Sequence, residues 1–327
     1  MSSGCSFKAV ILAGGSGERF WPLSTPERPK QFLRVFGGAS LIRQAVSRLD
    51  GLVSSKDVFV VTAKNLVAAT RRELPEIPKC NILGEPMRRD TGAAVALGVG
   101  LAASDADPVV GFFSSDQMVA NPKAFRKVVS KAVAIARRKQ VIVTLGIKPT
   151  YPATCFGYIS PKTRTFVEKP DAKTAKKYVK AGYLWNAGMF IARASTFRGA
   201  FAAHAPELER LTSGTKHLSA LYAALPKISF DYAVMEKAKN VEVVPGDFGW
   251  DDVGSFAAFD KYFPHDSRGN VREGPCNVVE ADGNICVARS ARISLLGVKN
   301  LVVVTTPDSV LVADKSRLTD MKKLFKR

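Results

Sequence analysis

The chain has 327 residues, of which 46% are hydrophobic and 24% are charged, and its formal net charge is +19. This length and composition favour a globular protein with a large α/β domain and a second, smaller domain. No run of about 18 apolar residues occurs, and the N-terminus lacks the charged-then-apolar pattern of a signal peptide. We therefore expect a cytoplasmic protein with no membrane partner.

Cysteine and histidine are sparse and scattered. The five cysteines and three histidines have no spacing typical of a disulfide framework, a zinc site or histidine-based catalysis. The strong positive charge is compatible with an anionic partner or with a basic, solvated surface. Because no basic stripe is interleaved with aromatic residues, we favour the solvated surface and expect no nucleic-acid partner.

An apolar run at residues 7–12 predicts a buried strand of a parallel sheet, and a glycine-rich turn follows it. Gly14, Gly15 and Gly17 allow the backbone to turn its N–H groups toward an anion, although a strand-to-loop turn needs glycine for geometry as well. Arg19 and Lys30 would add positive charge near the same phosphates. The pattern is neither a Walker loop nor Gly-x-Gly-x-x-Gly, so it predicts a nucleotide site of another kind.

The segment after the glycines carries Pro22, Pro26 and Pro29. These prolines exclude a regular helix, so we expect an extended loop that reaches Lys30. Such a long loop suits a lid over a ligand better than a simple connection.

The signature of a known family matches this loop. Residues 14–24, Gly-Gly-Ser-Gly-Glu-Arg-Phe-Trp-Pro-Leu-Ser, and residues 29–33, Pro-Lys-Gln-Phe-Leu, closely resemble the motif of mannose-1-phosphate guanylyltransferases, which are sugar-1-phosphate nucleotidylyltransferases. The resemblance implies that Arg19 and Lys30 are catalytic. It also implies a nucleotide-binding stretch of Leu12, Ala13, Gly14, Gly15, Ser16 and Gly17.

Helix and strand patterns alternate through the first half of the chain. We predict helices at 41–49, 66–74, 93–103 and 122–138, and strands at 58–61, 81–84, 109–113 and 141–145. This alternation predicts right-handed βαβ units and a Rossmann-like, mostly parallel sheet flanked by helices. The resemblance implies the mixed sheet of nucleotidyltransferases, which is similar to that of glycosyltransferase-A folds.

The segment at residues 85–94 follows the third predicted strand and leads into a helix of small residues. Small side chains allow close packing on the sheet, which is a sufficient structural reason for them. The resemblance implies, in addition, that this segment contacts the base and ribose through Glu85, Arg89, Thr91 and Gly92. Asp90, Gly92 and Ala93 stand where the family usually has Asn, Ala and Pro.

Two aspartates are candidate metal ligands. Asp116 follows a predicted strand, where a carboxylate lies on the ligand side of a parallel sheet, and Asp252 lies in Trp-Asp-Asp-Val-Gly at residues 250–254. Each could instead cap a turn or a helix. The resemblance implies that Asp116 and Asp252 bind Mg²⁺.

Three later segments, at residues 155–159, 166–170 and 185–190, resemble the sugar-phosphate half of the family in order and spacing. The resemblance implies that Glu168 accepts hydrogen bonds from sugar hydroxyls and that Lys169 binds the sugar phosphate. Gly157 and Asn186 would line the same pocket. A hexose phosphate needs both a hydroxyl acceptor and a cation, which Glu168 and Lys169 supply.

The last part of the chain has a different pattern. Helices are predicted at 194–203 and 231–238, and short β runs separated by Gly, Asn and Asp follow residue 270. We predict a catalytic domain at 1–265, with a nucleotide half at about 1–148 and a sugar-phosphate half at about 149–265. A small β-rich domain with a basic terminal helix at 316–327 would occupy 266–327.

The predicted reaction is transfer of GMP from GTP to α-D-mannose 1-phosphate with Mg²⁺, giving GDP-mannose and pyrophosphate. In-line attack of the sugar phosphate on the α-phosphorus needs no protein nucleophile. A sister enzyme for another base or sugar is one alternative. A non-catalytic subunit that senses the nucleotide sugar is another, and a homodimer is left open as the assembly.

Overall fold

The computed structural model describes residues 6–15, 17–103, 107–214 and 218–325. The chain divides into two compact units, each with its own buried hydrophobic cluster. The first unit comprises Met1–Gly14, Arg43–Ser115 and Val119–Trp250, and the second comprises Gly15–Ile42, Asp116–Met118 and Asp251–Arg327. The predicted boundary near residue 265 stays a prediction.

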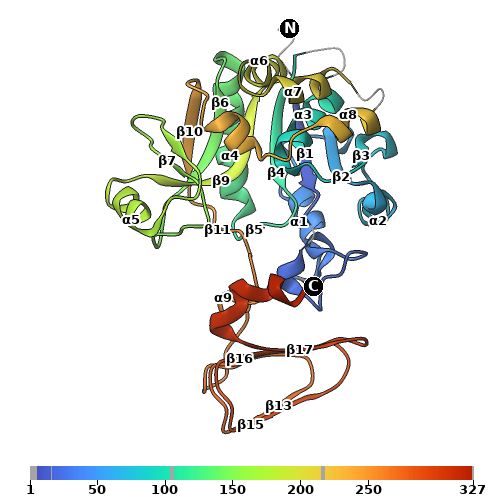
Figure 1. Cartoon of the computed structure of the whole chain (residues 1–327), viewed down its shortest axis with the longest axis vertical. Coiled ribbons are helices and arrows are strands. Elements are labelled where there is room, and N and C mark those ends of the chain that lie inside the picture. The colour runs from blue at the N-terminus through green and yellow to red at the C-terminus, as the bar shows by residue number, and fades with distance from the viewer. Residues whose placement is uncertain (1–5, 16, 104–106, 215–217, 326–327) are drawn as a thin grey trace. The chain divides into compact units, whose positions relative to one another are not determined.

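A nine-stranded sheet of the described residues forms the centre of the first unit (Figure 1). Its main path has the order β10-β6-β9-β4-β1-β2-β3, and β7 and β8 lie off this path. Only β9 on this path runs antiparallel to its neighbours, β4 and β6, so the predicted mostly parallel sheet is confirmed. The strands are β1 (Phe7–Ala13), β2 (Val58–Ala63), β3 (Ile82–Glu85), β4 (Val109–Ser114), β6 (Ile142–Ile147), β7 (Tyr158–Ile159), β8 (Phe166–Val167), β9 (Leu184–Arg193) and β10 (Val241–Gly246).

Helices cover both faces of this sheet. The helices are α1 (Leu41–Ser47), α2 (Val67–Glu73), α3 (Asp90–Ala102), α4 (Pro122–Arg138), α5 (Ala172–Lys180), α6 (Ala194–His204), α7 (Pro206–Glu209) and α8 (Leu218–Ala224). Phe112 contacts Phe197 of α6, and its neighbour Phe113 contacts Phe125 of α4. Successive residues of a strand point to opposite faces, so α6 and α4 lie on opposite sides of β4.

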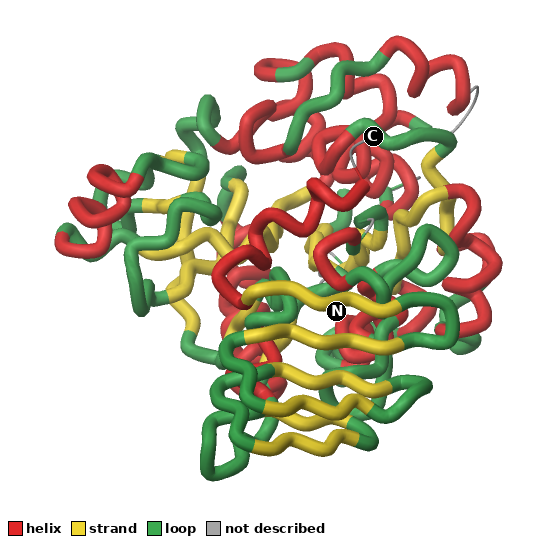
Figure 2. Tube along the Cα trace, turned by 60° about the horizontal axis from the view of Figure 1, so that its bottom comes forward, coloured by secondary structure: helices red, strands yellow, loops and turns green. Residues whose placement is uncertain are grey.

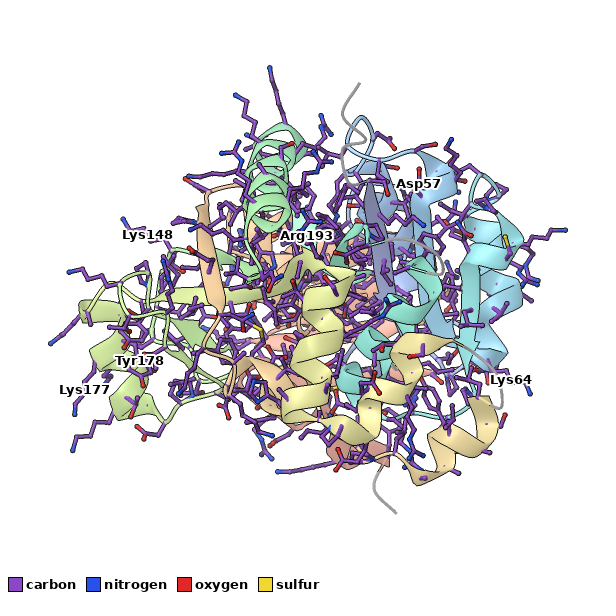
Figure 3. The ribbon with its side chains drawn as sticks, turned by 90° about the horizontal axis from the view of Figure 1, so that it is seen from above. Asp57, Lys64, Lys148, Lys177, Tyr178 and Arg193 are labelled. Atoms are coloured by element: carbon purple, nitrogen blue, oxygen red, sulfur yellow. The ribbon has the colours of Figure 1, made fainter. Side chains whose placement is uncertain are left out.

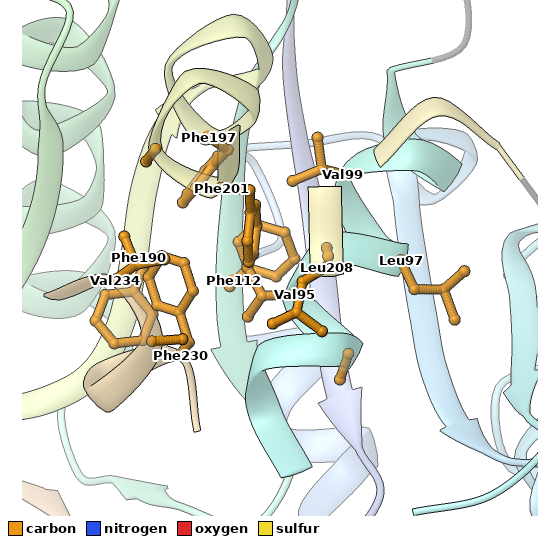
Figure 4. Close-up of a cluster of buried hydrophobic side chains, with 14 of the residues drawn as sticks. Val95, Leu97, Val99, Phe112, Phe190, Phe197, Phe201, Leu208, Phe230 and Val234 are labelled. Atoms are coloured by element: carbon orange, nitrogen blue, oxygen red, sulfur yellow. The ribbon is translucent and has the colours of Figure 1, made fainter. Parts of the chain in front are cut away.

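A cluster of buried hydrophobic side chains in the first unit includes residues of α3 and α6 (Figure 4). A Cβ at Gly98 of α3 would lie 2.6 Å from the Phe112 ring, so this glycine permits the close approach of helix and sheet that the small residues predict. Phe230 packs against Phe190, Phe197 and Phe201 from a separate segment. The cluster thereby ties the segment around residue 230 to the sheet.

The helices predicted at 93–103 and 231–238 differ from the structure. α3 begins at Asp90 and not at residue 93, because the Thr91 N–H is bound by the Asp90 side chain and the Gly92 N–H by the carbonyl of Ile228. These bonds satisfy first-turn donors that otherwise lack partners. The helix predicted at 231–238 is a π-helix at Asp231–Met235. Such turns occur frequently at functional sites.

The second unit contains short strands that stack as parallel rungs (Figure 2). β12, β14 and β16 form one stack, which antiparallel β17 closes, and β13 pairs with β15. The strands are β12 (Val271–Glu273), β13 (Cys276–Val279), β14 (Ile285–Ala288), β15 (Ile293–Leu296), β16 (Leu301–Thr305) and β17 (Val310–Asp314). The predicted β-rich C-terminal region is confirmed. The remaining α-helix of the described residues is α9 (Ala258–Tyr262), and the remaining strands are the two-residue β5 (Met118–Val119) and β11 (Trp250–Asp251), which pair with each other.

A ladder of asparagines supports the turns between rungs. The Asn284 side chain donates to the Asn270 side chain at 2.9 Å, and its own oxygen accepts from the Leu301 N–H at 2.9 Å. Both asparagines are fully buried. Because buried amides must be hydrogen-bonded, the ladder fixes the register of successive rungs.

The signature loop belongs to the second unit. It contains two short 3-10 turns, Glu18–Phe20 and Lys30–Phe32, and no α-helix among its described residues before α1, as the prolines predict. Phe20 packs against Phe256 at a ring distance of 5.3 Å. The C-terminal helix is a 3-10 helix at Lys315–Phe325, where an ordinary helix is predicted, and its Phe325 ring contacts Trp21.

Many basic side chains lie at the surface of the first unit. Lys64, Lys148 and Lys177 are exposed, and Figure 3 shows side chains projecting outward on every side of this view. This placement agrees with a solvated basic surface. Among the described residues, no helix has both the length and the apolar character needed to cross a membrane.

Candidate active site

The ammonium group of Lys30 lies beside both aspartates that are candidate metal ligands. Lys30 Nζ donates to Asp116 Oδ2 at 3.0 Å and to the backbone carbonyl of Asp252 at 2.8 Å. Lys30 is only 5% exposed, and the Asp116 side chain is 32% exposed. The second unit thus brings Lys30 together with two residues that lie 86 and 222 positions away in the sequence.

The backbone of the signature loop determines where Lys30 lies. Gly17 has a φ of 66°, and a Cβ there would lie 2.5 Å from the Lys30 backbone nitrogen. Only glycine fits this close approach. The Ser24 hydroxyl donates to the Gly17 carbonyl at 2.6 Å, and Lys30 Nζ lies 5.8 Å from the centre of the Phe20 ring. These contacts hold the lysine against the loop.

Arg19 completes this cluster. A Cβ at Gly254 would lie 3.1 Å from Arg19 Nη1 and 3.2 Å from Asp252 Oδ2, so guanidinium and carboxylate flank the same glycine. Val253, which lies between Asp252 and Gly254 in the sequence, has a φ of 47°, a strained conformation for a β-branched residue. Burial raises the pKa of the Asp252 carboxyl, while the Lys30 charge opposes this rise and the Asp116 charge adds to it.

The donor set of this cluster suits a hard divalent cation. Asp116 and Asp252 offer carboxylate oxygens, and they lie close enough for the Asp116 charge to raise the pKa of Asp252. Among the described residues, no group of three or more His, Cys, Asp or Glu side chains could hold a metal. Asp116 and Asp252 would be the protein's ligands to such a cation, and a bound triphosphate and water would supply the other oxygens.

The first strand leads to a cavity in the first unit. Leu12 and Ala13 end β1, and their carbonyls accept from the Ser115 N–H and the Thr62 hydroxyl. Gly14 lines a cavity of about 590 Å³ together with Glu85. The other lining residues are Ala63, Lys64, Asn65, Pro86, Met87 and Arg88. A cavity of this size accommodates a nucleobase with its ribose.

Glu85 is the buried polar group of this cavity. Its carboxyl accepts a hydrogen bond from the Tyr222 hydroxyl at 3.1 Å. Burial raises the pKa of Glu85 to about 7, although the Tyr222 hydrogen bond and the Arg88 charge oppose the rise. The carboxyl therefore changes charge near neutral pH.

The other three residues predicted for the base and ribose contact protein groups. The Arg89 guanidinium donates to the carbonyls of Tyr222 at 2.7 Å and Ala223 at 2.8 Å. Thr91 Oγ1 accepts from the Phe230 N–H, and a Cβ at Gly92 would lie 2.7 Å from the Ile228 carbonyl. Arg89, Thr91 and Gly92 thus anchor the 222–230 segment, which carries the hydroxyl that binds Glu85.

Asn186 is the centre of the predicted sugar site. Its side-chain oxygen accepts from the Thr144 hydroxyl at 2.6 Å and from the Gly188 N–H at 3.1 Å. Its side-chain nitrogen donates to Asp231 Oδ1 at 2.9 Å. The Asn186 N–H also donates to the Gly157 carbonyl at 2.8 Å, so Asn186 links β9 to the Gly157 segment.

Glu168 and Lys169 form an ion pair in the same region. Lys169 Nζ lies 2.8 Å from Glu168 Oε1, and the Lys169 side chain is 53% exposed. A Cβ at Gly157 would lie 2.5 Å from Glu168 Oε2, so glycine is required there for this carboxylate position. Partial burial lowers the pKa of Lys169, but the hydrogen bond and charge of Glu168 raise it more, and the net shift is upward. The lysine is a cation that can face an anion.

Asp231 belongs to this group and was absent from the residues predicted from sequence. Burial raises its pKa to about 7, and the Glu168 charge adds to the rise. The neighbouring Glu236 accepts from the Glu168 N–H at 3.0 Å. Like Tyr222, Asp231 is recognised only through its contacts, because a lone Asp in a helical pattern carries no signal of its own.

Ser16 and Gly15 are the last two residues of the predicted nucleotide-binding stretch. Ser16 lies outside the described residues. Gly15 has no heavy atom within 4 Å of the position that a Cβ would take, so packing within the protein does not require a glycine there.

Two family models match the chain. The model described as nucleotidyl transferase matches residues 8–268, and the model described as a MannoseP isomerase/GMP-like beta-helix domain matches residues 276–327. The second match agrees with the stacked rungs of the second unit.

Relatives cover nearly the whole chain. Mannose-1-phosphate guanylyltransferase of Escherichia coli (strain K12) is 35% identical over 97% of this chain and 72% of its own length. Mannose-1-phosphate guanylyltransferase RfbM of Salmonella typhimurium is 35% identical over 98% of this chain and 72% of its own length. A crystal structure named mannose-1-phosphate geranyltransferase, from Thermus thermophilus, has a TM-score of 0.90 and 36% identity and covers 98% of this chain and 99% of that chain. The chain belongs to the nucleotidyl transferase family and, within it, to the mannose-1-phosphate guanylyltransferases.

Proposed function

We propose that the protein transfers GMP from GTP to α-D-mannose 1-phosphate and releases GDP-mannose and pyrophosphate. Its kinship with named mannose-1-phosphate guanylyltransferases over nearly its full length supports this activity. The observation that carries the proposal is the cluster of Lys30, Asp116 and Asp252, because a non-catalytic relative has no need for an ammonium held between the Asp116 carboxylate and the backbone carbonyl of Asp252, a second acidic residue.

The nucleotide is bound by the β1 end and the Glu85 cavity. Guanine presents two neighbouring N–H donors on one edge, and an ionised Glu85 can accept from both. Arg88 lines the same cavity and is exposed, so its charge is available to phosphate or ribose. Arg89 acts indirectly in this proposal, by holding the segment of Tyr222.

The sugar phosphate is bound by Glu168 and Lys169. Lys169 neutralises the phosphate of mannose 1-phosphate, while Glu168 accepts from sugar hydroxyls. Gly157 leaves room for Glu168, and Asn186 is held by Thr144 and Asp231 at a fixed orientation. The contacts between Asn186 and Asp231 make the aspartate a positioning residue.

Catalysis requires charge neutralisation and alignment. A phosphate oxygen of mannose 1-phosphate forms a bond to the α-phosphorus of GTP, and the bond from this phosphorus to the bridging oxygen of the β-phosphate breaks. Arg19 and Lys30 stabilise the charge that develops on the leaving pyrophosphate. Asp116 and Asp252 would hold Mg²⁺, which supplies Lewis-acid neutralisation of phosphate charge when bound. We expect this reaction in the cytoplasm.

A panel assay tests the proposal. The purified chain is incubated with each of GTP, ATP, UTP and dTTP against mannose 1-phosphate and glucose 1-phosphate, and pyrophosphate release is measured. We expect the highest kcat/KM with GTP and mannose 1-phosphate. A higher value with another pair would identify a sister enzyme, and no release with any pair would support a non-catalytic sensor.

A further inference from the structure

A cavity in the second unit has a different set of lining residues from the Lys30 cluster: none of Arg19, Lys30, Asp116 and Asp252 lines it. Its volume is about 520 Å³, within the range of small-molecule sites. Residues 21–35 of the signature loop form one wall, and the β16–β17 turn and the end of β14 form the other. The lining comprises Trp21, Pro22, Leu23, Thr25, Arg28, Leu33, Arg34, Val35, Arg289, Thr306, Pro307, Asp308 and Ser309.

The charge of this lining is positive. Arg28, Arg34 and Arg289 outnumber the single carboxylate, Asp308. All three arginines are exposed. Guanidinium groups bind phosphate oxygens through paired N–H donors, so a cavity lined by several arginines suits phosphate recognition.

The Arg28 side chain is available for a ligand. Its backbone forms a turn with Thr25, in which N–H and carbonyl each make a hydrogen bond of 3.1 Å. Among the described residues, its guanidinium has no hydrogen-bond or ion-pair partner. Arg289 lies 3.2 Å from Glu273, an exposed ion pair that leaves other donors of the guanidinium available.

The rest of the lining suits a small polar body. Trp21 offers a flat apolar surface, and the hydroxyl-bearing residues Thr25, Thr306 and Ser309 line the same cavity. Tryptophan faces and hydroxyl groups together are suited to a sugar ring, which has apolar C–H faces and polar edges. A phosphate alone would leave most of this volume unfilled.

We propose that this cavity is an effector site for a phosphomonoester of about the size of a hexose phosphate. Arg28 and Arg289 bind the phosphate, and Trp21 contacts the body of the ligand. The wall residues belong to the same loop as Gly17 and Lys30, and Ser24 of this wall segment is bonded to the Gly17 carbonyl. A ligand in the cavity would therefore contact the same loop that carries Lys30.

Calorimetric titration tests this site. Glucose 6-phosphate, inorganic phosphate and glucose are titrated into the full chain saturated with GDP-mannose, so that the active site is filled. We expect glucose 6-phosphate to bind with a Kd of about 1 mM or lower, phosphate to bind more weakly, and glucose not to bind. No heat from glucose 6-phosphate, or equal binding of glucose, would overturn the proposal.

Three variants locate the binding. Arg28→Ala and Arg289→Ala should each weaken glucose 6-phosphate binding about tenfold, because each removes a charged hydrogen-bond donor. Arg292→Ala removes another exposed arginine of the same unit, outside this cavity, and should bind like wild type. Thermal melts check that all three fold. Equal affinity in all three variants would place the ligand elsewhere and refute the site.

Discussion

Lys30 Nζ lies 3.0 Å from Asp116 Oδ2 and also donates to the Asp252 carbonyl, so one ammonium bridges two segments that bear carboxylates. Both aspartates would bind one cation, and substitutions of residues that act as a unit lower the activity non-additively. Asp116→Asn and Asp252→Asn should each lower turnover by orders of magnitude, and the double variant should be little worse. Turnover is measured across a Mg²⁺ titration.

The neighbouring Asp251 provides a control for this series. Its carboxylate accepts from the Val253 N–H at 2.7 Å and pairs with Lys261, and an Asn there retains an acceptor. Asp251→Asn should therefore keep most of the turnover. If the losses of Asp116→Asn and Asp252→Asn multiplied in the double variant and did not respond to Mg²⁺, the two aspartates would not share an ion.

Lys169→Ala should raise the KM for mannose 1-phosphate about tenfold or more and leave the KM for GTP near wild type. The variant removes a cation that pairs with Glu168 at 2.8 Å and whose side chain is 53% exposed, so it is accessible to a ligand. Lys177→Ala on α5, an exposed lysine labelled in Figure 3, is the matched control and should change neither constant. Loss of GTP binding with intact mannose 1-phosphate binding would show that Lys169 serves the nucleotide.

The sequence allowed the signature loop and the mostly parallel sheet to be predicted, because their patterns are local, while the roles of the site residues stay predictions. A glycine turn after an apolar strand, and prolines that exclude a helix, are both contained in a few adjacent residues. The structure shows Gly17 in close contact with the Lys30 backbone, a contact that the motif spacing alone does not predict.

Residues that act through distant contacts could not be predicted. Tyr222 reaches Glu85 across 137 positions, and Asn186 reaches Asp231 across 45. The π-helix at Asp231 follows Phe230, whose ring contacts Phe201 of α6, and a helical period does not encode such a contact. The asparagine ladder has a local signal, since Gly269-Asn270 and Gly283-Asn284 repeat before successive strands, but two copies do not predict which side chains meet.

Gly157→Ala tests the position of Glu168. The added Cβ would lie 2.5 Å from Glu168 Oε2 and 2.8 Å from the Phe166 ring, so the carboxylate must move. We expect a higher KM for mannose 1-phosphate and a loss of about 1–3 kcal/mol of stability. Gly199→Ala in α6 is the control, because its Cβ meets open space, and it should be neutral or stabilising. Unchanged sugar kinetics in Gly157→Ala would show that Glu168 does not contact the sugar.

The pH dependence of stability should carry a contribution from Glu85. Its folded pKa of about 7 exceeds the ordinary 4.5, so between these values the folded state holds a proton that the unfolded state has lost. The contribution of Glu85 to the free energy of unfolding is therefore fully present below pH 4.5. It is lost as pH rises through 7, by about 3 kcal/mol in total. Glu85→Gln cannot ionise, and its unfolding free energy should lack this fall. Urea unfolding of both proteins from about pH 4 to 8 measures the difference.

The ionisation of Glu85 should strengthen GTP binding, although it lowers the stability of the fold. Only the ionised Glu85 accepts from both guanine N–H groups, so the KM for GTP should fall as pH rises through about 7 while stability declines. Tyr222→Phe removes a hydrogen bond that lowers the Glu85 pKa, and the fall in KM should then occur at higher pH. Glu85→Gln should show a high KM with no such transition. If wild type and Glu85→Gln had parallel KM profiles across this transition, Glu85 would not read the base, whatever its effect on stability.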